Sequence, residues 1–189
     1  MTQPPASSPA LASLAADPPQ IRAATLWAAI PPDDRRRAIA LAVTGDRQLR
    51  SVLIAAIRKT PRYKSFRADS FNGWSADQIG GAVQAPGVLP QEGIEAGLIA
   101  LHLGDRSAML AAFLDSLGIA HDNGTIRDTP DPLSLSDADL ARAADDLAAR
   151  YPADQVTVYM MTLMVVDPGL WGGLGSWLSG SSGAARPNS

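Results

Sequence analysis

Short apolar stripes at helical spacing, each closed by proline or glycine, constrain the fold of this chain most strongly. The clearest stripe lies between Asp105, which we expect to cap the helix, and Gly118, which ends it. Its apolar side chains share one helix face: Met109, Leu110, Phe113, Leu114 and Leu117. A second stripe follows Asp46 with the spacing of a core-facing helix: Leu49, Val52, Leu53, Ala56 and Ile57. Aromatic residues make up only 5% of the 189 residues, and alanine and leucine are frequent. This composition favours closely packed helices, so we predict an all-α fold.

The same signals predict a compact bundle of about seven or eight short helices. Their start and stop residues place helices over 20–30 and 32–45, from Asp46 onward, from Ser75 onward, over about 91–103, between Asp105 and Gly118, over 136–150 and over 152–166. The stretch 156–166 is apolar on all sides, which indicates the buried centre of the bundle. Its valines and threonines keep a buried strand open as the alternative.

One segment, 119–126, departs from the helical pattern. Asn123-Gly124 stands there between short apolar runs, and this dipeptide is the strongest short-range signal for a β-hairpin. We therefore expect a tight turn and a tiny two-stranded hairpin that packs on helices, since an isolated hairpin is only marginally stable.

The ends of the chain differ in composition from its middle. Residues 1–19 are rich in Pro, Ala and Ser, and residues 179–189 have the Gly/Ser composition of a linker. We predict a flexible N-terminal segment over 1–19, a single helical domain over 20–178 and a disordered tail over 179–189. No run of about 18 apolar residues occurs, which argues against a membrane span. Prolines and the lack of a basic start make 1–19 a poor secretory signal, so we expect a cytoplasmic protein.

Charge is unevenly distributed along the chain. The whole chain has a formal net charge of −3, but residues 1–74 contain 11 Lys or Arg and 5 Asp or Glu, whereas residues 75–189 contain 5 and 14. Such a division predicts two contrasting faces or self-complementary association. The alternative is that basic helices pack beside acidic ones within the fold.

Basic residues are densest where aromatic residues are interleaved with them, over 58–74. We name this stretch the basic-aromatic segment, and its candidate binding residues are Arg58, Lys59, Arg62, Tyr63, Lys64, Phe66, Arg67 and Trp74. Three interpretations stay open. The segment is an exposed loop whose aromatics cover the core edge, a site for an acidic partner, or a nucleic-acid site in which cations contact phosphates and rings stack on bases. A sequence pI of 5.2 weighs against nucleic acid.

Few residues suit catalysis or metal binding. The chain has no cysteine, which excludes disulfides, thiolate metal sites and a cysteine nucleophile. Its two histidines, His102 and His121, are not at metal-ligand spacing, and no nucleotide-binding or hydrolase motif occurs. We predict no metal and no cofactor. An acid–base pair of His121 with Asp122 or Asp115 is the remaining catalytic option.

The C-terminal stretch Leu170–Leu178 carries apolar residues at helical spacing. Trp171, Leu174 and Trp177 are therefore a candidate interaction end that docks on a partner or a membrane surface. The alternative is that the tryptophans fold back onto the helices, because glycines weaken an isolated helix and no Lys or Arg lines its polar face.

A run in the middle of the chain, MLAAFLDSLGIAHDNG at 109–124, resembles a segment of bacterial helical proteins without an established activity. In those proteins an FLDxLGIxHxxG run is followed by an acidic helix and a helix that begins with Tyr-Pro. The acidic stretch 136–150 and Tyr151-Pro152 follow in the same order here. The resemblance covers about 91–171, implies a shared helical fold and transfers no catalytic residue.

Taken together, these features favour a non-enzymatic interaction or regulatory domain that binds another protein or a second copy of itself. The second hypothesis is a nucleic-acid-associated module that uses the basic-aromatic segment. The third is an enzyme of unknown class with a site around His121 and Asp122.

Overall fold

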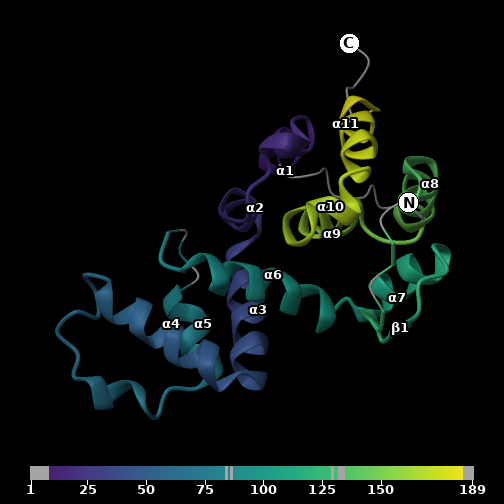
Figure 1. The fold of residues 1–189 in the computed structure, drawn as a ribbon. Helices are drawn as coiled ribbons and strands as arrows, with labels where there is room; N and C mark the ends of the chain where they lie inside the picture. The colour runs from purple at the N-terminus through teal and green to yellow at the C-terminus, as the bar shows by residue number, and fades with distance from the viewer. Residues whose placement is uncertain (1–8, 84, 86, 129, 132–134, 185–189) are drawn as a thin grey trace, which may run out of the picture. The chain divides into compact units, whose positions relative to one another are not determined.

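The computed structural model describes residues 9–83, 85, 87–128, 130–131 and 135–184. Within these ranges the chain forms eleven α-helices and one two-stranded antiparallel sheet, β1 (His121–Asp122) with β2 (Thr125–Ile126) (Figure 1). The predicted all-α fold and the small hairpin are confirmed. The helices outnumber the seven or eight expected because α1 (Pro9–Ala15), α10 (Pro168–Trp171) and α11 (Leu174–Ala184) are additional.

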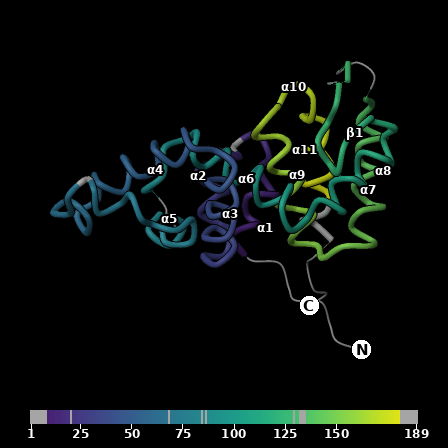
Figure 2. The backbone as a smooth tube through the Cα atoms, turned by 90° about the horizontal axis from the view of Figure 1, so that it is seen from below, coloured from purple at the N-terminus to yellow at the C-terminus, as the bar shows by residue number. Residues whose placement is uncertain are grey.

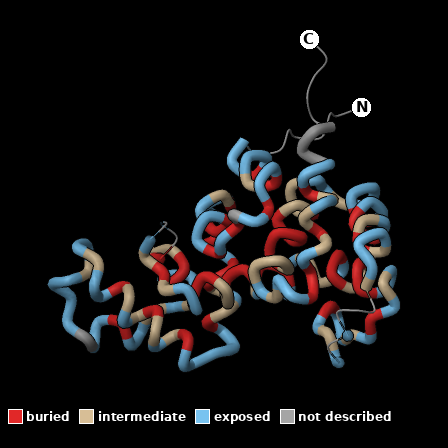
Figure 3. Tube along the Cα trace, turned by 45° about the horizontal axis from the view of Figure 1, so that its top comes forward, coloured by how far each residue is buried: buried red, intermediate tan, exposed pale blue. Residues whose placement is uncertain are grey.

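The helices gather in two compact units (Figure 2). Unit 1 comprises Met1–Arg22 and Arg106–Ser189, and unit 2 comprises Ala23–Asp105. The region 20–178, for which the sequence predicts a single domain, thus contains parts of both units. Figure 3 shows buried positions recurring along the helices between exposed ones, as expected for amphipathic helices that each turn one face inward.

Unit 2 is built around α3 (Pro32–Gly45), which packs against α5 (Ala76–Val83) and α6 (Gln91–Leu103). The other helices of unit 2 are α2 (Ala23–Ala29), α4 (Arg47–Lys59) and a short 3-10 helix, η2 (Ala68–Phe71). Glycine permits the close packing, because a Cβ on Gly97 of α6 would lie 2.8 Å from the Trp27 ring of α2. The helix predicted over 20–30 starts later, at Ala23, and a separate 3-10 turn, η1 (Pro18–Gln20), precedes it.

Helix ends in unit 2 follow the capping signals of the sequence. The Asp46 carboxylate accepts the backbone N–H groups of Gln48 and Leu49 at 2.8 and 2.9 Å, and α4 begins there. Ser75 and Gln78 form the reciprocal capping box at the start of α5, over 3.1 and 2.7 Å.

The first helix of unit 2 ends against a buried guanidinium. Arg35 of α3 donates to the carbonyls of Trp27, Ala28 and Ile30 at the C-terminal end of α2. Burial lowers the pKa of Arg35 from its ordinary value. The side chain is therefore used to close a helix end and is not presented to a partner.

Unit 1 is centred on α9 (Ala153–Val166), which contacts α1, α8 (Asp137–Ala148), α10 and α11. A continuous buried run, Val158–Thr162, lies in its middle. The open choice between helix and strand is thus decided for the helix, and its predicted central position holds within unit 1. Tertiary contacts on several sides explain why β-branched residues are tolerated there.

Two local predictions in unit 1 have different outcomes. The hairpin turn is confirmed, since Asn123 and Gly124 have φ of 50° and 88°, and His121 pairs with Ile126. The predicted cap of α7 (Ser107–Ser116) is wrong, because Arg106 and not Asp105 occupies the N-cap position. The Asp105 carboxylate instead accepts a hydrogen bond from Arg37 at 2.8 Å within unit 2.

Both segments predicted to be flexible contain helix where the structure describes them. Leu11 and Ala15 of α1 are buried, and α1 contacts α9 and α11. Residues 179–184 continue α11, while 1–8 and 185–189 lie outside the described residues. Contacts with α9 supply the burial that composition alone does not reveal.

Within the described ranges, no single helix combines the length and the apolar composition needed to cross a membrane. The helices α6 and α7 have the required length and apolar composition only when the two are counted as one segment.

Candidate interaction surface

The cations of the basic-aromatic segment all lie at the surface of unit 2. Leu49, Leu53 and Ile57 face the core from α4, so Arg58 and Lys59 in its last turn are exposed. Three more exposed cations follow between α4 and η2: Arg62, Lys64 and Arg67. Among the described residues, none of these five side chains pairs with a carboxylate.

Three arginines elsewhere in the described structure do pair with carboxylates. Arg36 and Arg37 of α3 bind Asp77 and Asp105, and in unit 1 Arg142 binds Asp139. The Arg36 guanidinium lowers the pKa of the Asp77 carboxyl, chiefly through their hydrogen bond. By contrast, the basic-aromatic segment gathers five exposed cations within ten residues, from Arg58 to Arg67, without a described carboxylate partner.

The aromatic rings of the segment pack on one another. Tyr63 meets Phe66, Phe71 and Trp74 edge to face, with ring centroids 5.6, 6.4 and 5.5 Å apart. Phe71 and Trp74 lie 4.7 Å apart, and the Arg62 guanidinium stands 5.2 Å from the Tyr63 ring centroid. The rings therefore form a small core of their own instead of a row of open stacking platforms.

Burial within this cluster is graded. Phe71 is completely buried and anchors the cluster, Tyr63 and Trp74 are half-buried, and Phe66 is 46% exposed. The sequence interpretation in which aromatics cover the core edge agrees with Phe71, whereas Phe66 leaves an apolar ring at the surface among cations.

Hydrogen bonds hold the segment in place. Successive turns are closed by the Tyr63 N–H to the Thr60 carbonyl at 3.1 Å and by the Phe66 N–H to the Tyr63 carbonyl at 3.0 Å. At its end, Arg50 of α4 donates to the Trp74 carbonyl. Figure 1 shows the chain leaving α4, passing through these turns and returning to α5. The cations thus project from an ordered loop, which reduces the entropy lost when a partner binds.

The candidate C-terminal interaction end is not the exposed apolar surface that docking on a partner or a membrane would require. Trp171 and Leu174 are buried in unit 1, and Trp177 is half-buried, with its indole N–H donating to the Asp145 carboxylate of α8 at 2.7 Å. The tryptophans therefore fold back onto the helices, because α9 and α8 offer them apolar contact and a hydrogen-bond acceptor. Their apolar surface is used inside unit 1.

The histidine candidate is held from both sides. His121 Nδ1 accepts the Gly124 backbone N–H at 3.2 Å, so the neutral ring carries its proton on Nε2 and donates it to Asp115 at 3.1 Å. Neither nitrogen keeps a free lone pair that could take a proton from a substrate. Asp122, the alternative partner, is exposed on β1. The arrangement ties the hairpin to α7.

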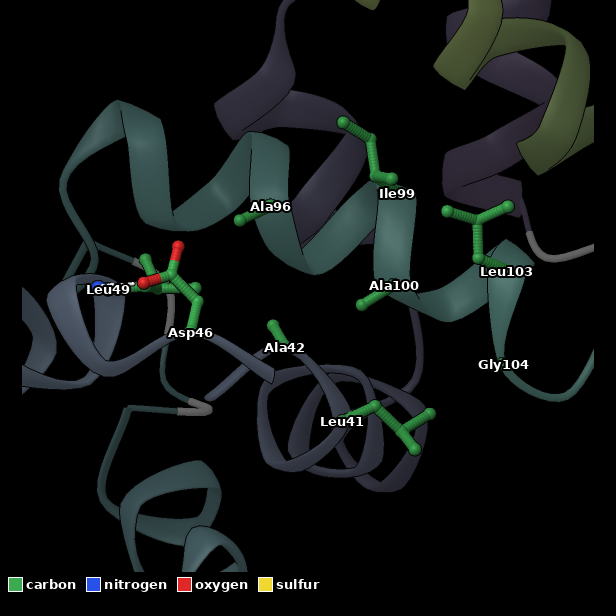
Figure 4. Close-up of a pocket in the computed structure, with 9 residues that line it drawn as sticks. All are labelled: Leu41, Ala42, Asp46, Leu49, Ala96, Ile99, Ala100, Leu103 and Gly104. Atoms are coloured by element: carbon green, nitrogen blue, oxygen red, sulfur yellow. Dashed lines mark hydrogen bonds between the residues drawn. The ribbon is translucent and has the colours of Figure 1, made fainter. Parts of the chain in front are cut away.

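A second surface feature, which the sequence interpretation missed, is an apolar pocket of about 470 Å³ in unit 2 (Figure 4). It is lined from α3, the start of α4 and the end of α6: Leu41, Ala42, Asp46, Leu49, Ala96, Ile99, Ala100, Leu103 and Gly104. Three of the five large apolar residues exposed in the described part of the chain, Leu41, Ile99 and Leu103, belong to it. The i, i+4 spacing of Ile99 and Leu103, off the buried stripe of α6, was the signal available.

No set of three or more His, Asp or Glu side chains gathers at metal-binding geometry among the residues that the structure describes.

Comparison with known proteins adds no relative: no family model, curated protein or solved structure matches the chain. The resemblance of 109–124 to bacterial helical proteins therefore stays a prediction.

Proposed function

We propose that this chain is a protein-interaction domain whose unit 2 binds an acidic protein surface through the basic-aromatic segment. The observation that carries the proposal is the set of five exposed cations, Arg58 to Arg67, that pair with no described carboxylate. Several unpaired like charges on one ordered loop raise the local positive potential. Such a potential steers and orients an acidic partner.

Phe66 supplies the apolar part of the proposed contact. Exposed ion pairs are individually weak, so a charged surface gains affinity when an apolar side chain is buried at its centre. Phe66 is 46% exposed, and Tyr63 and Phe71 support its ring at centroid distances of 5.6 and 6.0 Å. A supported but exposed ring loses little freedom on binding, which suits an anchor residue.

The packing of the rings favours a protein over a nucleic acid. Base stacking needs an open ring face, whereas neighbouring rings surround Tyr63 and Arg62 lies 5.2 Å from its centroid. Phe66 alone is substantially open. The nucleic-acid module therefore stays the second hypothesis, and the test below includes it as an outcome. The cytoplasm remains the proposed location, which fractionation of the source cells tests.

The test is fluorescence anisotropy with a labelled acidic peptide composed of Glu with interspersed Leu. The full chain should bind it, and the triple variant Arg62→Ala, Lys64→Ala, Arg67→Ala should bind at least about tenfold more weakly, because three charged contacts are lost. Phe66→Ala should reduce the part of the binding that persists in high salt.

A matched control removes equal charge elsewhere. The triple variant Arg47→Ala, Arg127→Ala, Arg150→Ala changes three other exposed cations and should bind the peptide like the unmodified chain. Equal loss in both triple variants would refute a specific site. Tighter binding of a mixed-sequence single-stranded oligonucleotide of the same charge would replace the proposal with the nucleic-acid module.

A further inference from the structure

We infer that the acidic partner of the basic-aromatic segment is a second copy of this chain, and that α8 of unit 1 is the surface it offers. The inference rests on the proposed function, since it names the partner of the same site. It commits to contact between copies, with the basic-aromatic segment of one chain facing the acidic helix of another.

Charge complementarity is the first argument. The basic-aromatic segment, 58–74, contains five Arg or Lys and one Asp, whereas unit 1 contains 11 Asp or Glu and 6 Arg or Lys. One copy of the chain therefore carries the negative charge that complements the basic-aromatic segment of another copy, and no further molecule is needed. Opposed potentials of this kind raise the association rate and fix the orientation of partners.

The surface of α8 is the second argument. One side of this helix is buried, and the opposite side faces outward. Asp145 and Asp146 are exposed there, whereas the buried stripe consists of Leu140, Ala143, Ala144 and Leu147. Trp177 of α11 donates to one oxygen of Asp145 at 2.7 Å and orients that carboxylate, while its other oxygen has no partner among the described residues. A carboxylate held in place binds a guanidinium with less loss of side-chain entropy.

Ion pairing within α8 indicates which of its carboxylates are available to another molecule. Asp139 is engaged by Ser136 and Arg142, and these hydrogen bonds lower the pKa of its carboxyl. Asp145 and Asp146 receive no such cation among the described residues. They are therefore two adjacent carboxylates of α8 that can accept arginines and lysines from another molecule.

The two surfaces differ, so the association is heterologous. Each copy offers one basic and one acidic surface, and such contacts build a ring or a growing chain of subunits instead of a simple two-fold dimer. Contacts made largely by exposed charges are weak and salt-sensitive, so assembly should appear only at high protein concentration.

The experiment is sedimentation velocity of the full chain over dilutions from about 1 mM to about 1 µM, which brackets weak association. The weight-average mass should rise with concentration at about 0.1 M salt and return to the monomer at about 1 M, where the Debye length falls from ~10 to ~3 Å. A monomer at every concentration in low salt would overturn the inference.

Charge exchange tests the two surfaces together. The variant Arg58→Glu, Lys59→Glu, Arg62→Glu and the variant Asp145→Lys, Asp146→Lys should each stay monomeric alone. Mixed together, they should associate again, because each supplies the charge that the other lacks. If the double variant unfolds, Asp146→Lys alone takes its place, because it keeps the hydrogen bond between Trp177 and Asp145. This single variant should stay folded and should associate more weakly than the unmodified chain.

The control is Asp122→Lys with Asp128→Lys, which changes the charge of unit 1 equally outside α8 and should leave association intact. Association lost equally in this control, or a mixture of charge variants that stays monomeric, would overturn the assignment to α8. The peptide experiment separates the two proposals. A chain that binds the acidic peptide but remains monomeric refutes self-association alone, and one that does neither refutes both.

Discussion

A Cβ placed on Gly80 of α5 would lie 2.4 Å from the backbone carbonyl oxygen of Arg36 on α3. Backbone atoms cannot yield as a flexible side-chain end can, so α3 and α5 approach this closely only because residue 80 is glycine.

The variant Gly80→Ala should therefore destabilise unit 2 by about 1–3 kcal/mol, because the added methyl group forces the two helices apart. Urea unfolding followed by circular dichroism measures the change. Gly81→Ala is the matched control, since its Cβ would come no closer than 3.9 Å to Arg36. The control should be neutral or stabilising by up to about 1 kcal/mol through helix propensity. Equal losses in both variants would contradict the steric explanation.

A second prediction concerns the N-terminal cap of α4. Asp46→Ala should cost about 0.5–2 kcal/mol, because the backbone N–H groups of Gln48 and Leu49 lose their acceptor. Asp46→Asn keeps a capping oxygen and should recover most of this free energy of unfolding. If the asparagine variant unfolds as early as the alanine variant, the charge of Asp46 and not its hydrogen bonds is what matters.

The hairpin turn depends on one glycine. Gly124 has φ of 88°, and a Cβ there would lie 2.6 Å from Cβ of Leu110 on α7. Gly124→Ala should therefore lower stability by about 1–3 kcal/mol through backbone strain and steric overlap together. Asn123→Gly should be tolerated, because glycine adopts the φ of 50° found there. Thermal unfolding of both variants, with tryptophan fluorescence as the signal, gives the comparison.

The Arg36–Asp77 pair predicts an acid-dependent loss of stability. The pKa of Asp77 is below its ordinary value of 3.8, chiefly because of the hydrogen bond from Arg36. Its contribution is therefore complete above pH 3.8 and is lost as the pH falls through the lower pKa of the folded state. The difference in Tm between the unmodified chain and Asp77→Asn should be constant near neutral pH and shrink in stronger acid. A difference that grows on acidification would show the opposite linkage.

Much of the helical architecture could be predicted because its determinants are local. The helix expected over about 91–103 is α6, Gln91–Leu103, and the helix over 32–45 is α3. Apolar spacing, the Asp46 cap and the Ser75–Gln78 capping box act between residues within four positions of one another. The Asn123-Gly124 turn depends on two adjacent backbone conformations. Such signals are legible without knowledge of the rest of the chain.

The failures occurred where a distant residue decided the outcome. Asp105 looks like a helix cap in the sequence, but Arg37, 68 positions earlier, pairs with it. Composition suggested a flexible segment over 1–19, yet Leu11 and Ala15 become buried because α9 and α11 lie beside α1. The pocket at Leu41, Ile99 and Leu103 was not predicted, because Leu41 lies on α3 whereas Ile99 and Leu103 lie on successive turns of α6. Only the packing of the two helices brings these residues together.

The sequence by itself determined that this chain is helical, where most helices begin and end, and which short stretch concentrates positive charge. Only the tertiary structure decided which apolar residues face inward: Trp171 and Leu174 are buried, whereas Phe66 stays at the surface. It also decided which cations are paired and which remain unpaired. The physical reason is range. Helix formation depends on neighbours within a few residues, whereas burial and ion pairing depend on partners that folding brings together from far along the chain.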